Sequence, residues 1–111
     1  MKTGSQLIAD ERERQISQEG WSATHDDDHQ HGELAVAGAC YALTQSGAIE
    51  GGANQIVDEM WPWHESSWKP GDPVRNLAKA GALIAAEIDR LQRLNVKGLA
   101  PLTEGAASTA G

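Results

Sequence analysis

The sequence has no phenylalanine, one tyrosine and one cysteine among its 111 residues. A single cysteine excludes an internal disulfide and any zinc site built from four cysteines. Basic residues are also scarce, with nine Lys and Arg against sixteen Asp and Glu, for a formal charge of −7. Because contacts to DNA phosphates need a surplus of basic side chains, we expect no general binding to duplex DNA.

Long apolar stretches are missing as well. The longest run without a charged residue, 34–49, consists mostly of Ala and Gly and is too short and too mild to span a membrane. The N-terminal segment lacks the apolar stretch of a signal peptide. We therefore expect a cytoplasmic protein that does not associate with membranes.

What the sequence does contain favours an all-α fold. No stretch alternates apolar and polar residues over six positions, as a half-buried strand would. We expect a small bundle of three to four helices within residues 1–97, with a Trp- and Pro-rich irregular segment, and a flexible tail at 98–111. The predicted helices cover about residues 5–19, 29–44 and 73–95, with one short helical turn at 55–60.

Capping residues set the predicted helix boundaries. Thr3 and Gln6 form a capping-box pair, and Gly20 stands where a glycine commonly ends a helix. Asp72 is a preferred N-cap residue. Pro73 then occupies the first helical position, where its missing N–H costs nothing. The last helix therefore has the best-defined start in the sequence.

The segment 61–71 holds three of the four tryptophans and two prolines, which excludes a continuous helix. In a protein without phenylalanine, tryptophans must supply core bulk, and we expect this role for Trp61 and Trp63. Trp68 is adjacent to Lys69, and a ring beside a cation also suits a nucleobase and its phosphates. For Trp68 both interpretations stay open.

Small residues dominate the predicted helix 29–44, so neighbouring helix axes can approach to the short end of the usual 8–10 Å or so. Cys40 in this helix is expected to act as a small buried hydrophobe. Such Ala- and Gly-rich faces bury little area within one chain, which favours a homodimer. The last helix carries an amphipathic stripe formed by Leu77, Ala80, Gly81, Ile84, Ile88 and Leu91.

Residues 25–33 hold three histidines, three aspartates and one glutamate. Imidazole with carboxylate suits a divalent transition metal, and carboxylates alone suit Mg or Mn. In the alternative interpretation, the aspartates only cap a helix and favour its positive end, with the histidines exposed. The metal interpretation predicts one divalent cation (Mg, Mn or Zn) held by His25, Asp26, Asp27, His29 and Glu33.

Residues 11–15 are all charged or amide-bearing. They form either a solvated face, in which each charged pair contributes about 0.2–0.5 kcal/mol, or a polar wall that faces residues 25–33. We call residues 25–33 the His/Asp cluster. An anion would also suit the free N–H groups where the last helix begins. The predicted ligand-binding residues are Arg12, Gln15, Trp21, Trp68, Lys69 and Arg75.

Short motifs follow one another in a recognisable order: ERERQ at 11–15, EGW at 19–21, HDD at 25–27, GELA at 32–35, WPW at 61–63, WKP at 68–70 and RNLAKA at 75–80. In this arrangement the chain resembles small proteins encoded by tailed phages and prophages, over about residues 7–93. The resemblance implies an accessory protein in the cytoplasm of a bacterial host. Such a protein would bind a small anionic ligand, such as a nucleotide, or a host protein, without catalysis.

More remotely, the chain is similar to MazG-like all-α nucleotide pyrophosphohydrolases, which hold Mg through two acidic pairs on successive helices. Glu33 matches one acidic position, but Val36 and Ala37 stand where its partner belongs. Arg75 and Lys79 lie on the face where the second pair would fall. The alternative function, a metal-dependent nucleotide pyrophosphohydrolase, therefore requires the His/Asp cluster to replace that Mg site.

Overall fold

A computed structural model describes residues 1–44 and 54–96 of the chain. Within these ranges the protein is all-α, as predicted, and no strand is present. The predicted tail at 98–111 lies outside the described residues, as do residues 45–53. The helices are α1 (Gly4–Ser17), α2 (Ala23–Asp27), α3 (Glu33–Leu43), α4 (Asn54–Met60) and α5 (Pro73–Val96), with a 3-10 turn at Glu65–Ser67.

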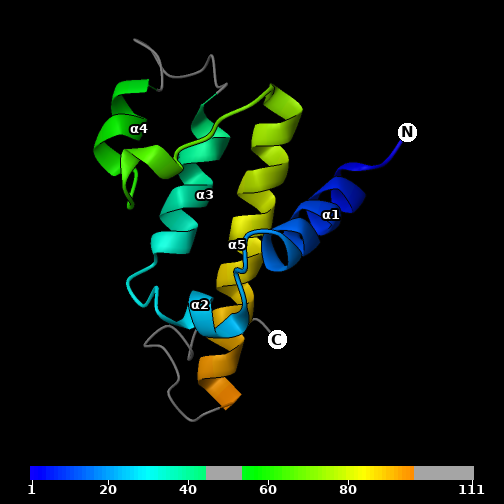
Figure 1. The fold of residues 1–111 in the computed structure, drawn as a ribbon, viewed down its shortest axis with the longest axis vertical. Coiled ribbons are helices and arrows are strands. Elements are labelled where there is room, and N and C mark those ends of the chain that lie inside the picture. The colour runs from blue at the N-terminus through cyan, green and yellow to red at the C-terminus, as the bar shows by residue number, and fades with distance from the viewer. Residues whose placement is uncertain (45–53, 97–111) are drawn as a thin grey trace, which may run out of the picture.

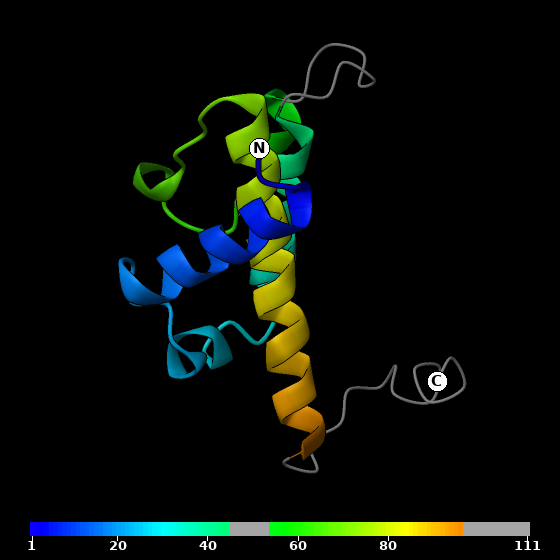
Figure 2. The same ribbon diagram turned by 90° about the vertical axis from the view of Figure 1, so that its right-hand side faces the viewer.

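The longest helix, α5, is the element against which α1, α2 and α3 pack (Figure 1). α3 lies along one side of α5, and α1 lies on another side and crosses it at a steep angle (Figure 2). α4 packs against α3. None of the described helices is long and apolar enough to cross a membrane.

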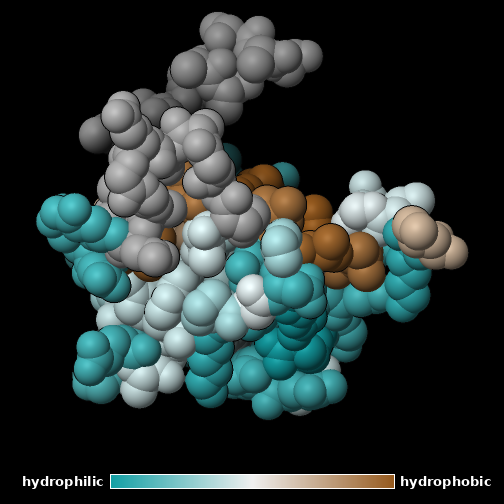
Figure 3. All heavy atoms as spheres, turned by 90° about the horizontal axis from the view of Figure 1, so that it is seen from above, coloured by the Kyte–Doolittle hydropathy of each residue, from teal (hydrophilic) through white to brown (hydrophobic). Residues whose placement is uncertain are grey.

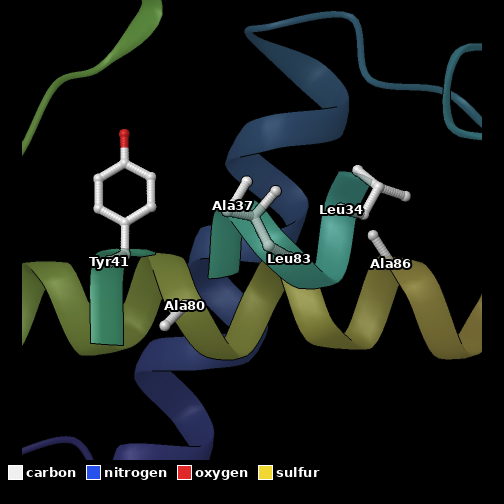
Figure 4. Close-up of a cluster of buried hydrophobic side chains, with 6 residues drawn as sticks. All are labelled: Leu34, Ala37, Tyr41, Ala80, Leu83 and Ala86. Atoms are coloured by element: carbon white, nitrogen blue, oxygen red, sulfur yellow. The ribbon is translucent and has the colours of Figure 1, made fainter. Parts of the chain in front are cut away.

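The core lies mainly between α3 and α5, which run antiparallel (Figure 4). Tyr41 of α3 lies beside Ala80 of α5, and Leu34 lies beside Ala86. The four tryptophans are only partly buried, and all of them pack against this core. The predicted core role of Trp61 and Trp63 is therefore confirmed. Cys40, also as predicted, is fully buried.

Local capping explains where the helices begin. The predicted capping box of Thr3 and Gln6 is present at the start of α1. Asp72 caps α5 by accepting a hydrogen bond from the main-chain N–H of Arg75 at 2.9 Å. At the start of α2, which was not predicted, Ser22 accepts a hydrogen bond from the main-chain N–H of His25 at 3.3 Å.

The predicted start of the second helix at His29 is wrong, because α3 begins at Glu33. Gly32, the residue before it, has a φ of +79°, in the left-handed region that favours glycine. The chain therefore turns at Gly32, and His29 and His31 lie on the connection between α2 and α3.

The apolar stripe of α5 faces outward to a large extent. Val74, Leu77, Ile84 and Ile88 are between 44 % and 61 % exposed. Figure 3 shows hydrophobic surface gathered along one side of the molecule, whereas the opposite side is largely hydrophilic. α1 crosses this stripe at Gly81, where an added Cβ would lie 2.6 Å from the Ile8 side chain.

We predict that a second copy of the chain covers this stripe. Each chain carries a net charge of −7, and this uncharged face lets two copies approach without opposing like charges. Light scattering at micromolar concentration should therefore give twice the chain mass of 11.8 kDa. The variant Ile88→Lys should give a single-chain mass, whereas Glu13→Lys, on the exposed surface of α1, should remain dimeric. A single-chain mass for the unmodified protein would contradict the prediction.

Candidate functional site

A pocket opens between α1, α3, α5 and the segment that follows α4. Its volume of about 220 Å³ suits a ligand smaller than the drug-sized molecules that fill most protein pockets. We call it the cationic pocket, for the charges described below. Its lining residues are Glu11, Arg14, Gln15, Glu19, Trp21, Tyr41, Ser67, Lys69, Lys79 and Leu83.

A buried carboxylate organises one wall of this pocket. Glu11 is 2 % exposed and accepts two hydrogen bonds from Arg14, from Nε at 2.8 Å and from Nη2 at 2.9 Å. Nη1 of Arg75 approaches the same carboxylate at 2.7 Å, and Nε2 of Gln15 donates to it at 3.1 Å. Two helices distant in sequence, α1 and α5, are thus joined through one glutamate.

The arginines keep this carboxylate ionised. Burial alone would raise the pKa of Glu11, but the hydrogen bonds and charge of Arg14, with the charge of Arg75, lower the pKa below its ordinary value of 4.5. The interpretation of residues 11–15 as a solvated face is therefore wrong for Glu11 and Gln15, which are both buried. Arg12 of the same run does face the His/Asp cluster, through Asp26.

Lys79 lies on another wall of the cationic pocket. Its Nζ donates to the main-chain oxygen of Lys69 at 2.5 Å and lies 5.3 Å from the centre of the Tyr41 ring. The Tyr41 hydroxyl in turn accepts a hydrogen bond from the main-chain N–H of Lys69 at 3.3 Å. Burial lowers the pKa of Lys79, and the positive charge of Arg75 lowers it further. An anion placed beside Lys79 would offset both effects.

The charges around the cationic pocket do not balance. Arg14, Lys69 and Lys79 line it, and Arg75 joins it through Glu11. Among the described residues, the lining also includes two carboxylates, Glu11 and Glu19, so the lining cations outnumber the lining carboxylates by three to two. Positive charge is thus concentrated at one pocket of a strongly acidic chain.

A second pocket of about 210 Å³ adjoins the first, because Trp21 and Ser67 line both. We call it the aromatic pocket, since four rings surround it in a closed series. Trp21 stacks parallel to His25 at 5.7 Å between ring centres, and His25 lies 5.0 Å from His29. His29 lies 5.0 Å from Trp63, which returns to Trp21 at 6.3 Å.

The carboxylates of the His/Asp cluster lie behind these rings and are engaged with different partners. Asp26 is fully buried and is contacted by Nδ1 of His25 at 3.0 Å and by Nη2 of Arg12 at 3.3 Å. Asp27 is paired with Arg93 of α5 at 2.8 Å.

Glu33 lies 3.7 Å from Nδ1 of His29 and accepts a hydrogen bond from the main-chain N–H of His31 at 2.6 Å. In the part of the chain that the structure describes, no three His, Cys, Asp or Glu side chains are grouped as a metal site. The predicted metal residues are therefore neighbours without a common centre, and metal binding there stays a prediction.

The six predicted ligand-binding residues separate into three groups. Gln15, Trp21 and Lys69 line the cationic pocket, and Arg75 reaches its wall through Glu11. Arg12 lies apart from that pocket, paired with Asp26.

Trp68 lies outside the lining of the cationic pocket and packs on Tyr41 and Trp61, with ring centres 4.6 and 4.7 Å apart. Sequence reasoning did not select Arg14 and Lys79. The available signals were the spacing of Arg14 three residues after Glu11 and of Lys79 one turn after Arg75.

The start of α5 is less suited to an anion than the sequence indicated. The carboxylate of Asp72 already accepts from the main-chain N–H of Arg75. The side chain of Asn76 accepts from the main-chain N–H of Gly71 at 2.7 Å and donates to the Gly71 oxygen at 3.0 Å. Of the two predicted ligand-binding cations near this helix start, Lys69 lines the cationic pocket and Arg75 pairs with Glu11.

The comparisons with known proteins identify no relative of this chain. No protein-family model, curated protein or solved structure matches the chain.

Proposed function

We propose that this protein binds a small anion in the cationic pocket, without catalysing its conversion. The observation that carries the proposal is the excess of cations at one pocket of a chain whose formal charge is −7. In an acidic protein, a local positive field of this kind attracts negatively charged ligands. Phosphate esters, nucleotides among them, are the ligand class that these cations suit best.

Lys79 is the cation best placed to contact the ligand directly. Glu11 engages both Arg14 and Arg75, and Glu19 also pairs with Arg14 at 2.9 Å. Lys79 has no carboxylate partner within salt-bridge distance among the described residues, and its only described hydrogen bond is to a main-chain oxygen. An ammonium group has three donors, so two remain for an anion.

The buried side chain of Gln15 supports the same proposal. It is 1 % exposed, lines the cationic pocket and turns its Nε2 to Glu11. Its Oε1 has no hydrogen-bond partner among the described residues. A buried acceptor without a partner costs about 1–3 kcal/mol, which a donor from a bound ligand, such as a sugar hydroxyl, would offset.

Titration calorimetry with inorganic phosphate and pyrophosphate tests the proposal. We expect binding that weakens as salt is raised, and at least tenfold weaker binding for Lys79→Met, because charge-assisted hydrogen bonds contribute about 1.5–3 kcal/mol. Lys2→Met is the matched control, since Lys2 is exposed and pairs only with Asp10. Equal affinity of Lys79→Met and the unmodified protein, or no binding of either anion, would overturn the proposal.

A further inference from the structure

The two adjoining pockets differ in chemistry and share a wall. The cationic pocket offers ammonium and guanidinium groups, and the aromatic pocket offers four rings and almost no charge at its surface. Trp21 and Ser67 line both pockets. A ligand that occupied both would need an anionic group at one end and a flat, apolar ring at the other.

We propose that the two pockets form one site for a nucleoside monophosphate, with the phosphate in the cationic pocket and the base in the aromatic pocket. This inference rests on the proposed function and adds the ligand class and the place of its ring. The base would lie among Trp21, His25, His29 and Trp63, and the sugar would pass the shared wall.

The ring geometry favours a flat ligand. Trp21 and His25 are stacked within 2° of parallel, with ring centres 5.7 Å apart, and together they line one part of the aromatic pocket. Bases stack on tryptophan and histidine rings without a requirement for a particular sequence, because every base has a π-face.

A carboxylate holds one of the two imidazoles in place. Nδ1 of His25 lies 3.0 Å from Oδ1 of Asp26, within hydrogen-bond distance, and a carboxylate in this position fixes the orientation of an imidazole ring. His25 is thereby oriented as a wall of the aromatic pocket. Nδ1 of His29 lies 3.7 Å from Glu33, beyond hydrogen-bond distance.

Trp63 provides a second, independent observation. Its Nε1 is buried and has no hydrogen-bond partner among the described residues, although the ring lines the aromatic pocket. Indole N–H groups usually find a partner when buried. A base carries ring nitrogens and carbonyl oxygens that accept hydrogen bonds, so a base bound against Trp63 would offer this N–H an acceptor. With Gln15 in the cationic pocket, each pocket thus has one wall residue with an unpaired polar atom.

The test compares adenosine 5′-monophosphate with ribose 5-phosphate, which has the same phosphate and sugar but no base. We expect the nucleotide to bind at least tenfold more tightly and to quench tryptophan fluorescence, whereas ribose 5-phosphate should leave the fluorescence unchanged. His29→Ala should remove most of the difference in affinity between the two ligands. The same variant should leave the affinity for ribose 5-phosphate unchanged, because His29 does not line the cationic pocket.

The variants also separate the two proposals. Lys79→Met should weaken the binding of both ligands, whereas Trp63→Leu should weaken only the binding of the nucleotide. Circular dichroism of each variant checks that the fold is kept. Equal affinities of the unmodified protein for the two ligands would overturn the base site and leave the anion site standing. Absence of binding by ribose 5-phosphate and inorganic phosphate, with tight binding of unphosphorylated adenosine, would overturn the anion site instead.

Discussion

Replacing Glu11 by alanine is expected to lower the free energy of unfolding by about 3 kcal/mol, near the lower end of what breaking a buried ion pair costs. The variant leaves the charges of Arg14 and Arg75 facing each other without a carboxylate between them. It also removes the partner of the buried Gln15 amide. We expect a cost near the lower end of that range because both arginines are partly exposed. The accessible fraction of the side-chain surface is 28 % for Arg14 and 39 % for Arg75.

Urea denaturation measures this effect, with an expected fall in the midpoint of about 1–3 M. Glu13→Ala is the matched control, because Glu13 is an exposed glutamate on the same helix, and its effect should stay within about 0.5 kcal/mol. The pKa of Glu11 is lowered in the folded state, so its contribution is present above pH 4.5 and is lost as the pH falls through the folded pKa. Equal midpoints for the two variants at neutral pH would show that the buried carboxylate is not a structural anchor.

Local signals in the sequence predicted where α1 and α5 begin. Thr3 and Asp72 act within three residues of themselves, and both cap the helices they were expected to cap. Gly32 is also a local signal, since glycine favours a turn there, but the predicted helix 29–44 runs through it. The short helix α2 was missed because a single turn leaves too few residues for a periodic pattern.

The candidate site depended on contacts that no local pattern contains. Glu11 and Arg75 meet across 64 positions in the sequence, and Asp27 meets Arg93 across 66. A run such as ERERQ looks like a solvated face until its partner helix is known. Burial of Glu11 and Gln15 therefore could not be read from their spacing, although the sequence left open that residues 11–15 form a polar wall.

The sequence pattern of α5 likewise did not predict which of its residues are buried. Its apolar residues recur with helical spacing, which ordinarily predicts the buried face. In the structure Ile84 and Ile88 of that stripe are largely exposed, whereas Asn76, Glu87 and Arg90 are buried. Leu83 and four alanines make up the rest of the buried face of α5, which agrees with the expectation that one chain buries little apolar area. The described residues leave part of this stripe exposed, which is the reason to expect a second copy.

Gly38→Leu is expected to destabilise the fold by about 3 kcal/mol, at the upper end of the usual cost of overpacking. A Cβ at Gly38 would lie 3.1 Å from the main-chain oxygen of Ala80 and 3.2 Å from the Ile84 side chain. The oxygen belongs to the middle of a 24-residue helix and cannot yield as a side-chain end would. Any larger residue must therefore push α3 and α5 apart along the core.

Two further variants distinguish the effect of crowding at Gly38 on stability from the effect of helix propensity. Gly38→Ala should be nearly neutral, because the gain of about 1 kcal/mol in helix propensity offsets the crowding from a single methyl group. Ala35→Leu places the same side chain on an exposed position of α3 and should change the free energy of unfolding by less than about 0.5 kcal/mol. In thermal and urea unfolding, Gly38→Leu should thus be much less stable than the other two variants. If Gly38→Leu were as stable as Ala35→Leu, the two helices could not be packed as closely as the structure places them.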